Sequence, residues 1–155
     1  MRRTFSAFVA ILVLVLLWAA IATGGKPIRE PLFSEGFDLP NVCDFPVAIE
    51  ITANKEFVTF FDDGRIHVTG KLFATVTNAE SGESLDINIS GPALISPESE
   101  RGGGRLLLIL FEEDVEGPGL LLTTGRVDII RGEDGFIDEF TVRGGRTDLC
   151  AALGG

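Results

Sequence analysis

Histidine is the first residue type to test for chemistry, because it serves both as a metal ligand and as a general base. His67 is the only histidine in the 155 residues, so a zinc or iron site built from several histidines cannot form within this chain. No G-x-S-x-G sequence offers a serine nucleophile for a catalytic triad either. We expect His67 to be a surface residue on the more polar face of a strand.

Carboxylates are the next candidates, since calcium prefers their oxygens as ligands. The acidic stretch 112–116 contains Glu112, Glu113, Asp114 and Glu116. It lacks the alternating ligand spacing and the glycine of an EF-hand loop. We therefore expect a solvated acidic loop and no bound metal.

Neighbouring carboxylates could also supply the acid and base of a glycosidase. The candidate pairs are Asp62–Asp63, Glu133–Asp134 and Asp138–Glu139. Sugar sites generally offer aromatic platforms, but the chain after residue 22 has no tyrosine or tryptophan, and its phenylalanines are expected in the core. The glycine-rich residues 101–105 lack the lysine and hydroxyl residue of a phosphate-binding loop. We expect a non-enzymatic protein with no catalytic residue and no cofactor.

Two cysteines, Cys43 and Cys150, lie near the two ends of the expected folded region. They do not form a C-x-x-C motif, and neither has a histidine or a basic cluster beside it in sequence that would make a thiol reactive. In an exported chain such a pair is most simply a structural disulfide.

The N-terminus predicts export. Residues 1–22 carry two arginines, then an apolar run, then an A-x-A ending, as a signal peptide does. The mature, secreted chain would start near Thr23. The alternative is an uncleaved helix that anchors the protein, since the apolar run approaches the length needed to span a bilayer.

All 23 acidic residues but only 11 of the 13 basic ones follow residue 22, which leaves the mature chain with a net charge of −12. A surface this acidic repels phosphate backbones and anionic membranes. We therefore expect no nucleic-acid partner and no membrane insertion of the mature chain.

The elements that position these residues are expected to be strands. Apolar and polar residues alternate from residue 47 onward, and turn sequences recur at residues 62–64, 78–84 and 132–135. After an extended leader at 23–45, residues 46–155 are expected to form one all-β domain, an antiparallel meander of seven or eight strands. A small closed β-barrel is the favoured architecture, with a β-sandwich as the alternative. The run 106–111 is apolar at every position, as in a strand covered on both sides.

The order of these motifs resembles a family of small exported actinobacterial proteins of unknown function. The shared features are a signal peptide, a Cys-x-Phe-Pro-Val start at residues 43–47, a "TGRV" strand at 124–127 and a D-[LV]-C-A ending at 148–151. Many members have Cys-Gly-Phe-Pro where this chain has Asp44. The resemblance implies export and a β fold, and it brings no activity.

The inward face of the meander is expected to be aliphatic and to contain no ionisable group. Its expected residues are Val47, Ile49, Ile51, Ile66, Val68, Leu72, Val76, Leu85, Ile87, Ile89, Val127 and Ile129. Such a face is either a solid core or a dry cavity for a small apolar ligand. The alternatives are a structural or protein-binding surface module that exposes its apolar strands, and a small isomerase or hydrolase with acidic residues on its loops. The oligomeric state is left open.

Overall fold

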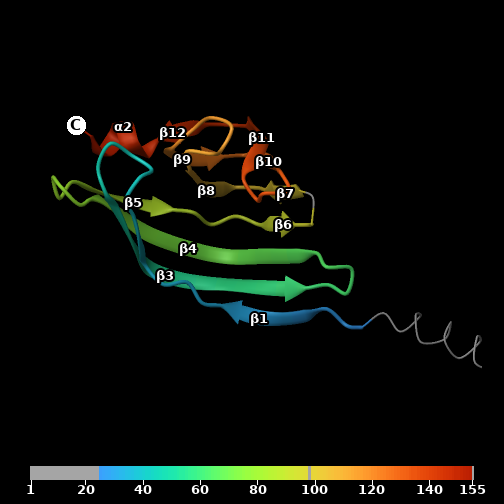
Figure 1. Ribbon diagram of the computed structural model, residues 1–155. Coiled ribbons are helices and arrows are strands. Elements are labelled where there is room, and N and C mark those ends of the chain that lie inside the picture. The colour runs from blue at the N-terminus through green and yellow to red at the C-terminus, as the bar shows by residue number, and fades with distance from the viewer. Residues whose placement is uncertain (1–24, 98, 155) are drawn as a thin grey trace, which may run out of the picture.

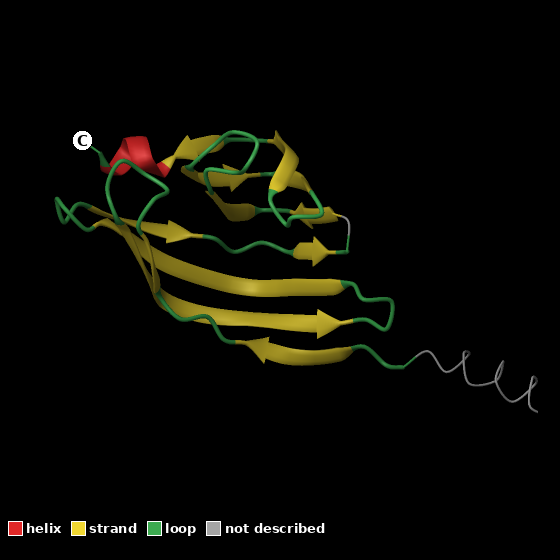
Figure 2. Ribbon diagram, viewed as in Figure 1, coloured by secondary structure: helices red, strands yellow, loops and turns green. Residues whose placement is uncertain are grey.

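The computed structural model describes residues 25–97 and 99–154. The expected signal peptide and its cleavage near Thr23 lie outside the described residues. Strands make up most of the described chain, with one short helix near the C-terminus (Figure 2), so the expected all-β fold is confirmed. None of the helices in the described part is long and apolar enough to cross a membrane.

In residues 25–97 and 99–154, twelve strands precede the C-terminal helix. They are β1 (Ile28–Leu32), β2 (Phe37–Leu39), β3 (Val47–Phe60), β4 (Ile66–Asn78), β5 (Ser84–Asn88), β6 (Ala93–Ile95), β7 (Ser99–Gly102), β8 (Arg105–Leu110), β9 (Gly119–Thr124), β10 (Arg126–Arg131), β11 (Ile137–Arg143) and β12 (Arg146–Asp148), and the helix is α2 (Leu149–Leu153).

The larger sheet is an antiparallel meander whose main path, β1-β3-β4-β6-β7-β10-β11, contains seven strands. β1 and β2 both pair with β3, which pairs with β4; β5 and β6 both pair with β4. The order continues through β6, β7, β10 and β11, while β8, β9 and β12 form a separate three-stranded sheet. Two parts of the extended leader expected at 23–45, namely β1 and β2, thus belong to the sheet. In Figure 1 the long strands β3 and β4 lie below, and β8, β9, β12 and α2 lie above them.

The predicted turns lie where the sequence placed them. Gly64 donates its N–H to Phe61, Gly82 to Asn78 and Gly135 to Gly132, each at 2.8–3.0 Å. These glycines have φ values between 78° and 89°, which L-residues with a side chain rarely adopt. The hairpins therefore close because glycine supplies the left-handed turn position.

At three places the chain bends sharply at glycines between consecutive strands. At each bend it passes from one sheet to the other. β7 and β8 are separated by Gly103 and Gly104, β9 and β10 by Gly125, and β11 and β12 by Gly144 and Gly145. The registers of β7 with β10 and of β8 with β9 match across the bend, and the Gly125 N–H donates to the Gly104 carbonyl at 2.8 Å. The bends between β7 and β8, β9 and β10, and β11 and β12 therefore fold the meander over itself.

Two apolar clusters lie on either side of the β8–β9 hairpin. Leu107, Ile109, Leu120 and Leu122 pack with β3, β4, β5 and α2. The opposite face of the hairpin, with Leu108, Leu110 and Leu121, packs against Val127, Ile129 and Ile137. Positions 106–110 of the apolar run are thus covered on both faces, as the sequence predicts, whereas Phe111 follows β8 and is 47% exposed.

Most phenylalanines of the described residues lie outside the core, contrary to expectation, although the partly buried Phe45 and Phe140 pack against the two apolar clusters. None of those in the described residues is buried, and Phe33 is 87% exposed. Leucine, valine and isoleucine fill the space between the layers, while Phe57 and Phe73 lie on the outer face of β3 and β4. The Arg29 guanidinium covers the Phe57 ring at 4.2 Å from its centroid, an arrangement that attracts a cation to the ring face.

The Cys43–Cys150 disulfide is present and joins residues 107 positions apart. Cys150 lies in helix α2, which the sequence pattern did not predict. The bridge therefore ties this helix to the segment before β3. The Asp148 side chain caps α2 by accepting from the Ala151 N–H at 3.0 Å. Leu149 and Leu153 of α2 are buried in the first apolar cluster.

The strand pairing leaves the sheet open. Within residues 25–97 and 99–154, no ladder joins β11 or β12 to β1 or β2. The bends place β8 and β9 over the concave face of β3 and β4. The observed arrangement is therefore a folded open meander with two facing layers, closer to the sandwich alternative than to a hydrogen-bonded closed barrel.

Candidate functional site

An apolar cavity of about 270 Å³ lies between the concave face of β3 and β4 and strand β8. Its aliphatic lining comes from Ile49, Ile51, Val68, Leu72, Ile89, Ala93, Leu106, Leu107 and Ile109. Five of these residues, Ile49, Ile51, Val68, Leu72 and Ile89, belong to the inward face expected from the alternating pattern. The volume is near the lower end of the roughly 300–1,000 Å³ typical of small-molecule sites.

One ionisable residue also lines this cavity, so the expectation of a face without ionisable groups is wrong. Glu56 of β3 is only 8% exposed, and it lines the cavity together with Ser34, Phe37 and Gly91. Ser34 and Glu56 are the cavity's two polar side chains. The cavity is therefore apolar except for a single carboxyl group and a hydroxyl group.

A β-bulge directs Glu56 inward. The register between β3 and β4 shifts between Ile51 and Ala53, so that odd-numbered residues face inward before the shift and even-numbered ones after it. An extra residue in one strand reverses the alternation that follows it. Without the shift, Lys55 would face the cavity in place of Glu56.

The neighbours of Glu56 leave its carboxyl group without a protein partner. Asn54 is committed elsewhere: its Nδ2 donates to the Leu32 carbonyl at 2.9 Å, and its Oδ1 accepts from the Glu56 N–H at 2.9 Å. The residue opposite Glu56 on β4 is Gly70, which has no side chain to offer. Among the described residues, no hydrogen bond or ion pair involves the Glu56 carboxylate.

Burial raises the pKa of Glu56 above the value of 4.5 that the free side chain has. The physical cause is the loss of water around the charged form, which no opposite charge offsets. A carboxyl group with a raised pKa inside an apolar cavity is a feature of many functional sites. Glu56 is accordingly the candidate functional residue of this cavity.

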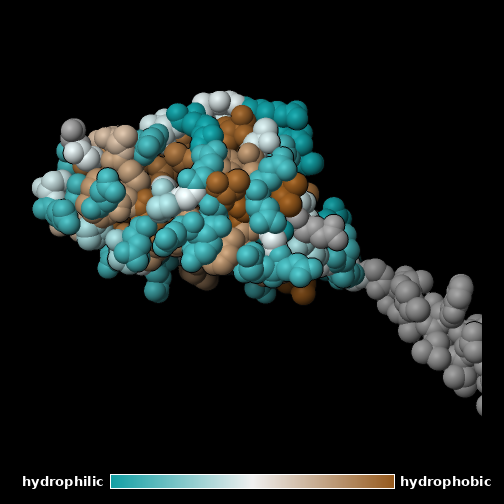
Figure 3. Space-filling model, turned by 45° about the horizontal axis from the view of Figure 1, so that its top comes forward, coloured by the Kyte–Doolittle hydropathy of each residue, from teal (hydrophilic) through white to brown (hydrophobic). Residues whose placement is uncertain are grey.

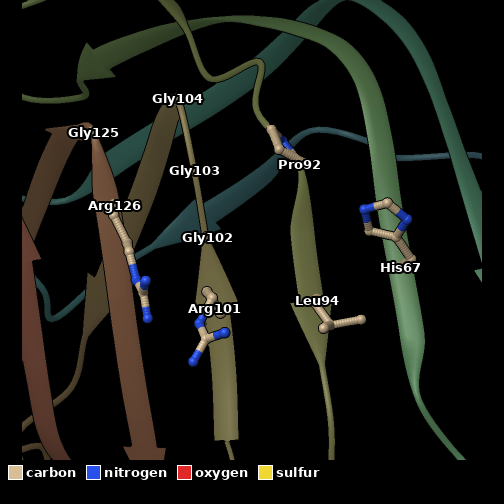
Figure 4. Close-up of a pocket in the computed structure, with 9 residues that line it drawn as sticks. All are labelled: His67, Pro92, Leu94, Arg101, Gly102, Gly103, Gly104, Gly125 and Arg126. Carbon is tan, nitrogen blue, oxygen red and sulfur yellow. The ribbon is translucent and has the colours of Figure 1, made fainter.

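A second depression, of about 340 Å³, lies on the outer face of the sheet (Figure 4). Glycines 102–104 and Gly125 contribute to its lining, together with His67, Pro92, Leu94, Arg101 and Arg126. His67, Leu94 and Arg101 are register neighbours across β4, β6 and β7. Since adjacent residues of a strand point to opposite faces, His67 lies on the side of the sheet away from Val68 and the cavity, as expected of a residue on the polar face.

The two arginines of this outer depression share one carboxylate. Asp128 accepts from Nε of Arg126 and from Nε of Arg101, both at 2.8 Å. Hydrogen bonds from Arg126 and then Arg101 lower the pKa of Asp128 to about 2. This cluster of two exposed arginines and one half-buried carboxylate forms part of the polar outer face of the sheet.

The acidic stretch 112–116 does not converge into a metal site. Asp114 uses both carboxylate oxygens on backbone N–H groups, those of Phe111 at 2.7 Å and Ile137 at 2.6 Å. Glu116 pairs with Arg146, while Glu112 and Glu113 are exposed. The part of the chain that the structure describes contains no group of three or more acidic, histidine or cysteine residues suited to a metal ion.

The carboxylate pairs considered for sugar chemistry serve turns or lie on the surface. Asp63 binds the Arg65 side chain through Nε at 2.7 Å, and Asp134 accepts from the Phe136 N–H at 3.1 Å. Asp138 and Glu139 are exposed on β11. None of these residues lines the apolar cavity.

The sequence alone does not identify Glu56, because the adjacent apolar residues Phe57 and Val58 fit either register, but the burial pattern of β3 does. Ile51 and Val58 both face inward in one continuous strand, yet an odd number of positions separates them. A period of two cannot place both on one face unless the strand contains a bulge. The polar residues between them mark the interruption, and placing the bulge there identifies Glu56 as inward-facing.

Comparisons with known proteins provide no functional assignment. No family model, curated protein or solved structure matches the chain. The resemblance to small exported actinobacterial proteins therefore stays a prediction. The chemistry of the cavity is the available guide to function.

Proposed function

We propose that this protein is an exported, non-enzymatic binding protein that holds a small, largely apolar ligand in the cavity between β3, β4 and β8. The observation that carries the proposal is the aliphatic lining of the cavity, which includes Val68, Leu72 and Leu107. Burying apolar ligand surface there is favourable by roughly 25 cal/mol per Å². The disulfide supports the exported setting, because such bridges persist in oxidising compartments.

The apolar concave face extends from the cavity toward the end of the sheet. Val68 and Ala93 line the cavity, and Ile66 and Ile95, two residues further along the same strands, are direct register partners. Phe60 pairs with Ile66 and is 42% exposed. Ile66, Ile95 and Phe60 thus extend the apolar character of the concave face beyond the residues that line the cavity.

The alternative of a protein-binding surface built from the apolar strands has less support. The side chains of β8 and β9 on which it rested pack into the two apolar clusters. Figure 3 shows one face of the molecule, where hydrophobic residues appear in patches among hydrophilic ones. The two most exposed large apolar residues, Ile28 and Phe33, belong to the N-terminal strand region, and the others are distributed over β2, β3, β4, β10 and the loop after β8.

The loop-based enzyme has less support for a different reason. Its candidate acidic residues are separated, since Asp114 is bound to backbone groups and Glu116 to Arg146. Catalysis needs several polar groups converging at one place, whereas the cavity offers Glu56 and Ser34.

Isothermal titration calorimetry of the mature chain with decanol tests the proposal. We expect saturable binding of one decanol per chain. Val68→Phe fills the cavity and should weaken this binding at least about tenfold, whereas Thr69→Phe places the same ring on the outer face of the same strand and should leave it unchanged. Absence of saturable binding, or equal effects of the two substitutions, would refute binding in the cavity.

A further inference from the structure

We propose that Glu56 makes the cavity selective for amphiphilic amines, so that the ligand class is a positively charged ammonium group attached to a small apolar body. This inference rests on the proposed function, because it concerns the ligand of the same cavity. It begins from Glu56, a residue that is only 8% exposed, that lines the cavity, and whose carboxylate has no hydrogen-bond or ion-pair partner among the described residues.

The protein does not supply the missing positive charge. Lys55 and Lys71, the basic residues nearest to Glu56 and Gly70 in sequence, are exposed register partners on the outer face of β3 and β4. On the inner face, Glu56 lies between Leu32 of β1 and Gly70 of β4. A buried charge without a partner is costly, and an opposite charge in hydrogen-bonding range offsets that cost.

An ammonium group supplies what this position lacks. It carries hydrogen-bond donors and a positive charge, whereas an ionised carboxylate only accepts, and charge-assisted hydrogen bonds are roughly twice as strong as neutral ones. A fatty acid would instead place a second carboxylate near Glu56, and like charges repel. The rest of the lining is aliphatic, so the remainder of the ligand must be apolar.

The whole molecule favours the same sign of ligand. The chain after residue 22 carries a net charge of −12, so its field attracts cations and repels anions on approach. The β-bulge then determines the charge inside the cavity, because it brings Glu56 inward and leaves Lys55 outside. Both the negative net charge of the molecule and the inward-facing Glu56 therefore favour a cationic ligand.

Calorimetry with three probes of one chain length, decylamine, decanol and decanoate, tests this selectivity at pH 8 in about 0.3 M salt, which screens the surface charges. At this pH the amine is protonated, since alkyl ammonium groups like that of lysine have a pKa near 10.4. We expect decylamine to bind at least about tenfold more tightly than decanol, and decanoate most weakly. In Glu56→Gln the preference for the amine should disappear while decanol still binds.

Glu50→Gln is the matched control, because Glu50 is an exposed carboxylate on the same strand. It should keep the full preference for the amine. Equal affinities of decylamine and decanol in the unmodified protein, or a preference that persists in Glu56→Gln, would overturn the inference and leave apolar binding intact. Failure of all three probes to bind would instead overturn the proposed function itself.

A second measurement uses the unmodified protein and does not depend on how the variants fold. The carboxyl carbon of Glu56, followed by NMR during a pH titration, should report a lower pKa with saturating decylamine than without it, because a bound cation stabilises the carboxylate. Decanol should not lower this pKa. The same titration with and without the amine would contradict the proposed ion pair.

Discussion

The Glu56 carboxyl group is held where its negative charge costs stability. The residue is 8% exposed, its carboxylate has no partner among the described residues, and partial burial raises its pKa. A fully buried unpaired polar group costs about 1–3 kcal/mol, and a carboxylate at the wall of a cavity bears only part of that cost. Binding sites often retain such a cost because the ligand removes it.

Replacing this carboxyl group by an apolar side chain of similar length should therefore stabilise the fold. We expect Glu56→Met to increase the free energy of unfolding by up to about 1 kcal/mol at pH 8 in urea titrations, the low end of the cost of an unpaired buried group. The control Glu50→Met changes an exposed residue of the same strand and should stay within about 0.5 kcal/mol of the unmodified protein. A loss of stability in Glu56→Met would show that the carboxylate has a stabilising partner.

The same substitution has a predicted pH dependence. The folded-state pKa of Glu56 lies above its ordinary value of 4.5, so the folded protein holds this proton more tightly than the unfolded chain does. The contribution of Glu56 to stability therefore falls as the pH rises from 4.5 through the folded pKa. The advantage of Glu56→Met should be largest above that pKa and should shrink by pH 4. Glu30, which lies on β1 near Leu32, the partner of Glu56, is exposed. The pH dependence of the stability difference between Glu56→Met and the unmodified protein should therefore come mainly from Glu56.

Asp128 provides the opposite case at the outer depression. Hydrogen bonds from Arg126 and Arg101 hold its pKa at about 2, so its contribution to stability is present above pH 3.8 and is lost as the pH falls toward 2. Arg126→Ala removes the larger cause and should raise the pKa of Asp128. NMR titration of the Asp128 carboxyl carbon measures this change. An unchanged pKa would mean that Arg101 alone determines it.

At the scale of elements, the glycine bends decide how the meander folds over itself. A Cβ atom at Gly125, where φ is 94°, would collide with the Arg143 carbonyl oxygen of the neighbouring strand. At Gly64, where φ is 82°, nothing lies within 4 Å of a Cβ. The two glycines thus share an unusual backbone conformation and differ in the space around them.

This contrast predicts the cost of two alanine substitutions. Gly64→Ala should lower the free energy of unfolding by about 1 kcal/mol, the usual cost of placing alanine at a positive φ. Gly125→Ala should cost at least about 1 kcal/mol more, because the backbone must also move to relieve the collision. Urea unfolding measures both. Equal costs would mean that the bend tolerates displacement of β10 from β11.

The elements also show where sequence patterns succeed and where they fail. The hairpins were predictable because Asp-Gly and similar turns act within a few residues, as at Gly64 and Gly135. The facing of Glu56 was missed because one extra residue at the β3 bulge reverses the pattern that follows. Alternation shows only which residues of one strand segment share a face. A bulge reverses which of the following residues face inward.

For the whole molecule, the Cys43–Cys150 bridge restrains the unfolded chain more than any local contact does. It closes a loop of 107 positions, for which the chain-entropy estimate of stabilisation is about 4–5 kcal/mol. We expect a Cys43→Ala/Cys150→Ala protein to lose about 4 kcal/mol in urea unfolding. A loss below about 1 kcal/mol would indicate that the packing of Leu149 and Leu153 already holds α2 in place.

The overall architecture was predictable only in part. Short turns imply antiparallel neighbours, so the meander followed from local sequence. Whether the sheet closes depends on contacts between its two ends, and the glycine bends direct β8 and β9 over β3 and β4 instead. The same long-range packing fills the core with aliphatic residues and leaves Phe33 and Phe60 exposed. No local pattern encodes that choice.

The most direct test of ligand binding in the concave cavity is a methyl NMR titration of the mature protein with decanol. Signals of Val68, Leu72, Ile89 and Leu107, which line the cavity, should shift together and saturate at one ligand per chain. Signals of Leu94, which lines the outer depression, should not change. Shifts that never saturate, or that are confined to Leu94, would contradict a ligand site between β3, β4 and β8.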